Sequence, residues 1–324
     1  MRIYVGRRRV DALDSGPMKR KHPIENAPRG CASGARPETE RPATEPVCGF
    51  GRDRMPYGSV MECMARTPVY SVRTSSLPLA QLMRPSKDLD RLLDYVETIC
   101  DVEGPTPEPF ERYLEYPVWP RDSATGLVLG KPSMSDAMLL GAHVRIAVEA
   151  KWTEPHYGPY QTVGTWLEAP SPDGLGIARK RAVLEAWIDE VRAAGALRRD
   201  VSAASLSDIP YQLLHRTASV CHHAGAEYAK KPILCYIVFR DTDASQAEAA
   251  ATAIFEDSIL GRWTSWLDFS AIEVLLVSVP IVGCPEPMPT TQVARLFIDI
   301  GKGLSPYRFD WDGIAMRRGA DHRV

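Results

Sequence analysis

The sequence of 324 residues lacks the features that mark several familiar protein classes. Its seven cysteines include no CxxC pair, so we expect free thiols and a reducing, cytoplasmic compartment rather than a disulfide framework. Because no apolar run approaches the length of a membrane span, we expect no membrane partner. The absence of a phosphate-binding GxxxxGK[ST] loop, a dinucleotide fingerprint and a GxSxG elbow argues against NTPases, Rossmann oxidoreductases and common α/β-hydrolases.

Strong charge of either sign is also lacking, because the formal net charge is −2 and gives no global signal for nucleic acid. The basic residues gather locally, since residues 1–54 hold twelve Lys or Arg and seven Asp or Glu, a difference of +5. Residues 1–75 are rich in Pro, Gly and Arg and show no lasting periodicity, which predicts a flexible, largely disordered basic tail. Such a tail either adds affinity for nucleic acid, or is only a solvated extension, or precedes the true start codon.

The remaining chain shows alternating helical and strand patterns. They predict a single α/β domain over residues 80–305, with a mixed sheet flanked by helices, followed by a polar C-terminal tail over residues 306–324. The expected elements are a helix capped by Ser86, a Pro-rich loop or edge segment at 104–125, a short strand at 127–129, strands at 137–140 and 144–151, helices at 178–194 and from 208, a buried strand at 232–239, a helix at 245–260, a strand at 272–279 and a short strand at 293–300.

The strand at 144–151 carries the most suggestive polar pattern. Its period of two places Glu149 and Lys151 on the same face, and Asp136 lies thirteen positions before Glu149, at the start of the preceding strand. A hairpin would bring the three side chains together. Two carboxylates are hard oxygen ligands for Mg²⁺, and a lysine beside them can orient a water or stabilise developing charge. The alternative is an exposed charge pair with Asp136 as a turn residue.

Ser135-Asp136 together with Val148-Glu149-Ala150-Lys151 resembles the PD-(D/E)xK nuclease superfamily, over roughly residues 85–240. The position before Asp136 departs from that pattern, since it holds Ser135 rather than Pro. The resemblance implies a restriction-endonuclease-like αβββαβ core and a Mg²⁺-dependent endodeoxyribonuclease, with Mn²⁺ as a substitute.

The resemblance also implies roles for individual residues. Asp136, Glu149 and the backbone carbonyl of Ala150 would bind the metal, and Lys151 would position the attacking water. Glu97 on the first helix is a candidate additional ligand, although a surface carboxylate is the alternative. DNA would be the partner, a restriction or defence role would fit, and such enzymes are often homodimers because a two-fold protein matches a two-fold DNA site.

Further polar residues are candidates for substrate contacts. Arg179, Lys180 and Arg181 lie in the first turn of a helix, where cations oppose the helix dipole, which suggests either a phosphate partner or a solvated turn. Gln212 and Arg216 are neighbours on one face of the next helix. Candidates directly after the strand at 144–151 are Glu154, Tyr160 and Gln161.

Two rival hypotheses stay open. In the first, the chain is a catalytically inactive member of the nuclease fold that binds DNA or a protein partner. In the second, it is an unrelated α/β protein in which Asp136 lies far from Glu149. A zinc hypothesis is suggested by His215, Cys221, His222 and His223. Because His222 and His223 would point in different directions and no second cysteine pair exists, we expect histidines on a helix surface instead.

Overall fold

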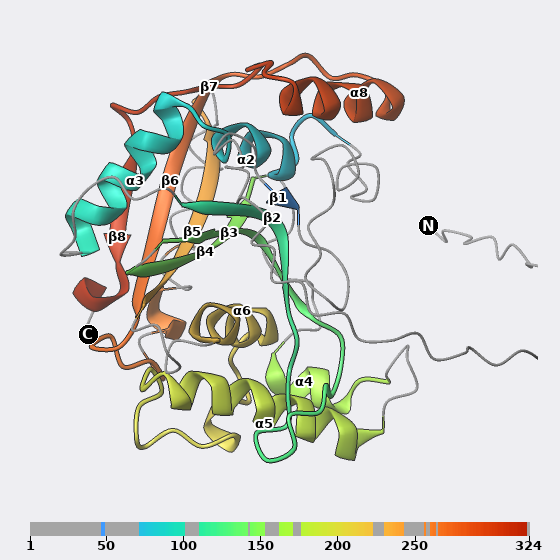
Figure 1. Ribbon diagram of the computed structural model, residues 1–324, viewed down its shortest axis with the longest axis vertical. Helices are drawn as coiled ribbons and strands as arrows, with labels where there is room; N and C mark the ends of the chain where they lie inside the picture. The colour runs from blue at the N-terminus through green and yellow to red at the C-terminus, as the bar shows by residue number, and fades with distance from the viewer. Residues whose placement is uncertain are drawn as a thin grey trace, which may run out of the picture. The chain divides into compact units, whose positions relative to one another are not determined.

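A mixed β-sheet with helices on both faces forms the centre of the protein in the computed structural model (Figure 1). The α/β class with a mixed, helix-flanked sheet is therefore confirmed. All described residues belong to the unit Pro42–Val324. The structure describes residues 47–48, 71–100, 110–141, 143–152, 162–170, 176–222, 230–242, 256, 260–263 and 265–322.

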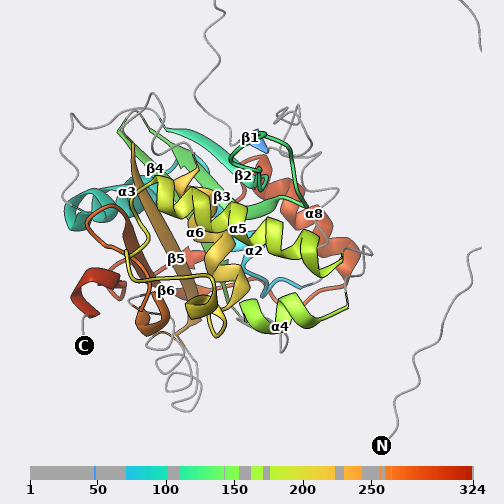
Figure 2. The ribbon, with the colours of Figure 1, turned by 90° about the horizontal axis from the view of Figure 1, so that it is seen from below.

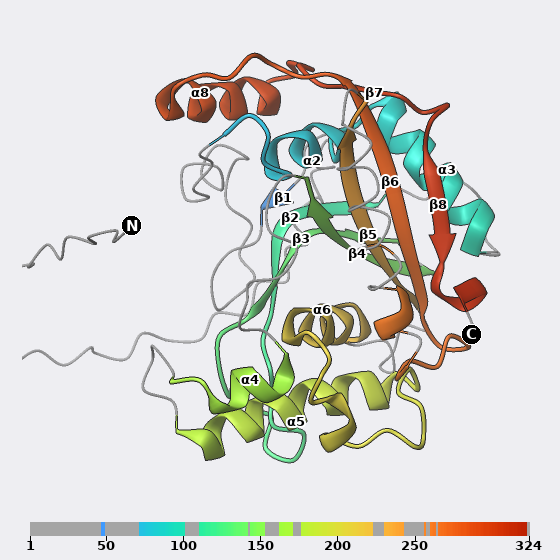
Figure 3. The same cartoon turned by 180° about the vertical axis from the view of Figure 1, so that it is seen from behind.

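The strands follow one another across the sheet in chain order from β1 to β7, and β8 lies beside β6 (Figure 3). Strands β2, β3 and β4 are antiparallel, whereas β4, β5 and β6 are parallel, so the chain must cross over between the latter. The strands are β1 (Val47–Cys48), β2 (Glu111–Val118), β3 (Ser133–Leu140), β4 (Val144–Lys151), β5 (Lys231–Asp241), β6 (Glu273–Gly283), β7 (Arg308–Phe309) and β8 (Ala315–Arg318).

Two layers of helices cover the sheet, and Figure 2 shows the layer of α4, α5 and α6 in front of the strands. The opposite face is covered by α2, α3 and α8. The helices are α2 (Ser76–Leu82), α3 (Lys87–Cys100), α4 (Val163–Glu168), α5 (Ile177–Ala193), α6 (Tyr211–Cys221) and α8 (Thr290–Gly301), with short 3-10 turns η1 (Ala204–Leu206) and η2 (Gly319–His322).

The apolar run of β5 explains why both layers are needed. Ile233 and Ile237 point into the core under α2, α3 and α8, while Leu234 and Val238 point into the core under α5 and α6. Because each of these side chains is almost completely buried and each contributes roughly 1.5–3 kcal/mol by leaving water, the strand is stable only between two layers.

Several predicted elements are confirmed. The strand predicted at 144–151 is β4, and the buried strand at 232–239 lies within β5. The predicted helix cap is also present, because the Ser86 Oγ accepts a hydrogen bond from the Leu89 N–H at 3.4 Å.

The first strand of the sheet core was predicted in the wrong place. Residues 127–129 lie outside the named strands, and β2 instead occupies Glu111–Val118, within the segment predicted as a Pro-rich loop or edge segment. Pro117 is tolerated because, among the described residues, β1 pairs with β2 only at Tyr113 and Leu114, so the N–H missing at Pro117 is not needed on that edge.

The C-terminal part differs from prediction as well. Residues 293–300 form part of helix α8 rather than a strand, because Val293, Phe297 and Ile300 recur at helical spacing and all three are buried. Residues within the predicted polar tail at 306–324 form β7 and β8, which pair with β6.

Other predicted segments fall mainly outside the described residues. One is the helix predicted at 245–260. The other is the tail at 1–75, and within that tail the structure describes only β1 and residues 71–75. None of the helices in the described part of the chain is long and apolar enough to cross a bilayer.

We predict that Gln81→Ala destabilises the protein by roughly 2–4 kcal/mol, because it leaves two buried backbone groups without a partner. The Gln81 amide donates to the Tyr307 carbonyl at 2.8 Å and accepts from the Tyr307 N–H at 3.0 Å, which ties α2 to the C-terminal segment. Chemical denaturation would measure the loss. The control Gln292→Ala, on the exposed side of α8, should change the free energy of unfolding little; equal effects of both substitutions would contradict the prediction.

Candidate active site

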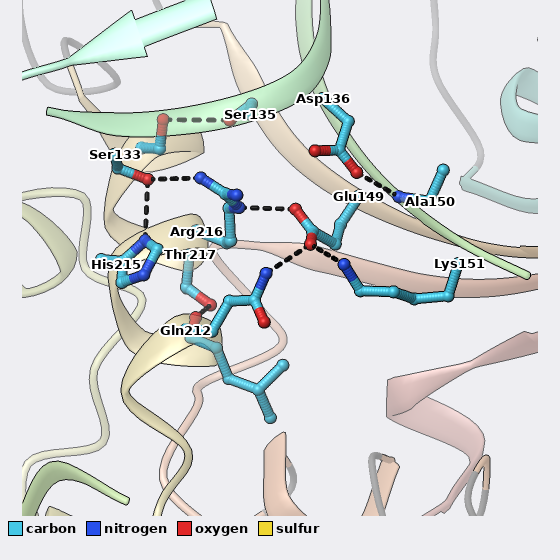
Figure 4. Close-up of polar contacts among 12 residues, drawn as sticks. Ser133, Ser135, Asp136, Glu149, Ala150, Lys151, Gln212, His215, Arg216 and Thr217 are labelled. Atoms are coloured by element: carbon cyan, nitrogen blue, oxygen red, sulfur yellow. Dashed lines mark hydrogen bonds and ion pairs between the residues drawn. The ribbon is translucent and has the colours of Figure 1, made fainter. Parts of the chain in front are cut away.

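The antiparallel pairing of β3 and β4 brings the predicted acidic residues together. Ala137 pairs with Val148, which places Asp136 and Glu149 in neighbouring positions of the two strands. The Asp136 Oδ2 accepts a hydrogen bond from the Ala150 N–H at 2.8 Å (Figure 4). The structure thus places Asp136 beside Glu149, and the alternative in which they lie far apart is not what is observed.

Glu149 is the most enclosed of these groups, with only 1% of its side chain exposed. Lys151 Nζ donates to its Oε1 at 2.6 Å, and Arg216 Nε donates to its Oε2 at 2.5 Å. Burial alone would raise the pKa of Glu149, but the charges of Arg216 and Lys151 outweigh burial and lower it. The carboxylate is therefore held in its ionised form.

Helix α6 supplies the second pair of site residues. Gln212 and Arg216 lie one turn apart, so both reach the same carboxylate, and Gln212 Nε2 contacts the Glu149 Oε1 at 2.5 Å. Leu213, Leu214 and Val220 of the same helix are buried, which fixes the rotation of α6. The predicted neighbourhood of Gln212 and Arg216 is confirmed, and their shared partner is Glu149.

A third carboxylate, Glu115 on β2, was missed by sequence reasoning. It lies opposite Asp136, between the pairs Leu114–Ala137 and Tyr116–Ser135. Burial, followed by the charge of Asp136, raises the pKa of Glu115 to about 8. An acidic residue between buried apolar positions would have been a signal, but the segment was predicted only as a Pro-rich loop or edge segment, and no face was assigned to Glu115.

The backbone conformation at Glu115 reverses which face of the sheet the side chains of β2 point to. Among the described residues it is the only non-glycine with a positive φ, at 51°. Leu114 packs on the side of α2 and α3, whereas Tyr116, two residues later, packs on the side of α5 and α6. Side chains two apart on a regular strand share one face, so the reversal at Glu115 redirects the remainder of the hairpin towards α6.

This reversal brings Ser133 into contact with α6. The Ser133 Oγ accepts a hydrogen bond from Arg216 Nη1 at 3.1 Å and lies 2.8 Å from the His215 Nδ1. Burial, followed by the charge of Arg216, lowers the pKa of His215 well below its usual value, so this imidazole is neutral. His215 is thus a partly buried partner of Ser133 rather than the surface histidine predicted, and the pair orients Arg216.

The charges of the site do not balance when every group is ionised. Three carboxylates face two cations, Lys151 and Arg216. Burial, followed by the charge of Glu149, raises the pKa of Asp136 to about 6. A divalent cation fits this excess of hard oxygen donors by type. However, no group of three or more His, Cys, Asp or Glu side chains within the described residues is arranged as a metal-ligand set.

The predicted basic cluster on α5 has different partners. Lys180 is buried, and its Nζ donates to the carbonyls of Trp166 at 2.7 Å, Leu167 at 3.4 Å and Ala169, at the end of α4. This ammonium caps α4, which is a structural alternative to the predicted phosphate contact. Arg179 donates to the Leu129 carbonyl at 2.7 Å, and Arg181 is exposed.

Glu97 is not brought to the site. It lies on α3, near Cys100, whose carbonyl accepts from Lys231 Nζ at 2.9 Å. Lys231 pairs with Val144, at the opposite end of β4 from Lys151. The expectation that Glu97 is a ligand is therefore wrong, because the first helix covers the other face and the other end of the strands. Glu154, Tyr160, Gln161 and His223 lie outside the described residues.

We predict that Asp136→Asn becomes more stable relative to wild type as pH rises. The folded protein holds the Asp136 proton to about pH 6, whereas the unfolded chain releases it near pH 4, so wild-type stability falls between these values. The introduced amide does not titrate, and its oxygen still accepts the hydrogen bond from the Ala150 N–H. The difference in the free energy of unfolding should reach up to about 3 kcal/mol by pH 8.

Urea denaturation from pH 4 to pH 8 in the presence of a chelator measures this difference. The exposed Asp94→Asn serves as the matched control and should follow the wild-type profile. A stability difference between Asp136→Asn and wild type that stays constant with pH would contradict the assigned environment of Asp136.

Comparison with known proteins places the chain in a family without assigning an activity. Searches of curated proteins and of solved structures gave no match. Residues 64–272, more than half of the chain, match one protein family. The protein therefore belongs to the family described as a domain of unknown function, DUF6946.

Proposed function

We propose that this protein is a metal-dependent nuclease that hydrolyses phosphodiester bonds in DNA, with a restriction-endonuclease-like core. The observation that carries the proposal is the convergence of Asp136, Glu149 and Lys151 at neighbouring positions of β3 and β4. If these residues served only as surface charges, their convergence would be accidental. Glu149 is not a surface charge, because its side chain is buried.

The order of elements supports the proposal. The chain runs through α3, β2, β3 and β4, then through a helical layer to β5, which pairs in parallel with β4. This order agrees with the αβββαβ core that the sequence resemblance implies. The core places the acidic residues on its second and third strands, where Asp136 and Glu149 lie.

The residues fit a hard divalent cation by their chemistry. Asp136, Glu149 and the Ala150 carbonyl would hold Mg²⁺ or Mn²⁺. Such an ion supplies positive charge beside the phosphate and makes a nearby water more acidic. Oε1 of Glu149 accepts two hydrogen bonds and Oε2 accepts one, so a metal could bind at the remaining site on Oε2, whereas ligation through Oε1 requires exchange of Lys151 or Gln212.

The remaining side chains have defined tasks in this scheme. Lys151, released from Glu149, would orient the attacking water and stabilise charge on the phosphate. Burial alone would lower the pKa of Lys151, but Glu149 and Asp136 raise it, so the ammonium carries its proton and acts as a donor rather than a base. Arg216 and Gln212 would hold Glu149 in place as Lys151 moves.

A second candidate function is a catalytically inactive nuclease fold that binds DNA or a protein partner. The observation that favours it is the full pairing of Glu149 with Lys151, Gln212 and Arg216, which is also how a purely structural buried charge is stabilised. A homodimer and a restriction or defence role are proposals that rest on the same resemblance, and a cytoplasmic location is a proposal that rests on the unpaired cysteines of the sequence.

We predict that the protein nicks or linearises plasmid DNA with Mg²⁺ or Mn²⁺, and that Lys151→Ala reduces the rate by about 100-fold or more. The loss follows because alanine provides no donor for the water or the phosphate. Gel electrophoresis of plasmid over time, with and without chelator, measures the rates.

The matched control is Lys302→Ala, an exposed lysine at the end of α8, which should cleave at the wild-type rate. Metal-dependent cleavage that persists in Lys151→Ala would contradict the proposal. DNA binding by folded wild-type protein without any cleavage would favour the second candidate function.

A further inference from the structure

The tip of the β2–β3 hairpin, residues 120–129, extends beyond the paired strands. The two arms stay joined, because the Leu129 N–H donates to the Pro120 carbonyl and the Asp122 N–H donates to the Leu127 carbonyl, both at 2.9 Å. Arg121 and Val128 form an isolated antiparallel bridge. The hairpin tip is therefore a continuation of the strands that carry Asp136 and Glu115.

The turn at the end of the hairpin tip is fixed from within. The Asp122 Oδ1 accepts hydrogen bonds from the Ala124 N–H at 3.1 Å, the Thr125 N–H at 2.7 Å and the Thr125 hydroxyl at 2.8 Å. These bonds, led by the Thr125 hydroxyl, lower the pKa of Asp122. Gly126 adopts the positive φ of 71° that the turn requires. The exposed side chains next to it are consequently held in place.

Helix α5 supports the hairpin tip from one side, as Figures 1 and 3 show. Arg179 Nε donates to the Leu129 carbonyl at 2.7 Å, and the Ser123 hydroxyl donates to the Asp189 Oδ2 at 3.1 Å. A Cβ at Gly130 would lie 3.0 Å from a Val183 methyl group, so hairpin and helix approach closely. The hairpin tip and the first turn of α5 therefore form one continuous surface.

This surface exposes apolar side chains together with basic ones. Leu127 is 65% exposed, Val128 is 42% exposed and Ile177, two residues before Arg179, is 54% exposed. Apolar residues scattered singly on a surface need no explanation, but an apolar group beside polar side chains marks an interaction site. The exposed basic residues of the surface are Arg121, Lys131, Arg179 and Arg181.

We propose that this surface, formed by the hairpin tip and the first turn of α5, docks duplex DNA. The basic side chains would contact phosphates, and Leu127 and Val128 would enter a groove, as apolar wedges do in minor-groove binding proteins. Charge complementarity favours a polyanion, because the four basic residues outnumber the two carboxylates at this surface. Asp122 already accepts hydrogen bonds from the turn, and Asp189 accepts from Ser123 and pairs with Arg192. The choice of DNA rests on the proposed function.

Distance along the hairpin is consistent with one duplex reaching both places. Leu129 lies seven residues before Asp136, which corresponds to roughly 20–25 Å along an extended arm. That length is about six or seven base-pair steps. A duplex with one phosphate group at the site carboxylates would extend over the hairpin tip. The hairpin tip would then position the duplex without contributing to the chemistry.

Fluorescence anisotropy with a labelled duplex several turns long, in chelator, tests the inference. We expect Leu127→Ser to weaken binding about tenfold, equivalent to about 1.4 kcal/mol. Arg181→Gln should weaken binding and reduce the slope of log K against log salt by about 1. The matched controls, Leu304→Ser and Arg199→Gln, are exposed elsewhere and should bind as wild type. Unchanged melting temperatures would show that the variants are folded.

The outcomes separate this inference from the proposed nuclease. If the surface variants bind like their controls while wild type cleaves DNA, the docking surface is wrong and the nuclease stands. If the surface variants alone lose binding but wild type never cleaves, the docking surface stands and the nuclease fails. Binding of wild type to anionic lipid vesicles but not to the duplex would overturn the docking inference.

Discussion

The buried carboxylate of Glu149 is the constraint on which the arrangement around the site depends. An ionised carboxylate removed from water is costly unless it is paired and hydrogen-bonded. Lys151, Gln212 and Arg216 meet this need from β4 and α6, so the charge links strand and helix. Removing one partner of such a pair typically costs about 3–5 kcal/mol, which makes the position of α6 dependent on Glu149.

The reversal of β2 at Glu115 is the second feature that shapes the site. A regular strand would keep Ser133 and the arm beyond it on the side of α2 and α3. The positive φ at Glu115 turns the hairpin towards α6, where Ser133 orients Arg216. Positive φ is unfavourable for a residue with a Cβ, and three carboxylates also gather there at an electrostatic cost. Strain of both kinds at one place is typical of a site that binds or reacts.

The sequence predicted the central features of the site because they are local. The period of two in 144–151 was sufficient to place Glu149 and Lys151 on one face, and helical spacing was sufficient to pair Gln212 with Arg216. Only a short turn separates the strands that carry Asp136 and Glu149. The number of residues between the two was therefore sufficient to predict that they lie at neighbouring positions of the paired strands.

What the sequence did not reveal depends on contacts between distant segments. Pro117 suggested a loop or edge segment. In the structure it lies within β2, beyond the two positions at which the described residues of β1 pair with that strand, and Glu115 was missed because the strand was not assigned. Lys180 was expected to meet phosphate, but the end of α4 folds over it. Val293 and Phe297 fit a short strand until their helical spacing is considered together with the core that they fill.

The central claim is that Asp136 and Glu149 hold a divalent cation. The most direct measurement is the anomalous diffraction of a crystal soaked with Mn²⁺. The account predicts a peak within about 2.0–2.3 Å of oxygens of both carboxylates, with Lys151 or Gln212 displaced from Glu149. Peaks elsewhere only, or no peak with Glu149 still paired as observed, would contradict it.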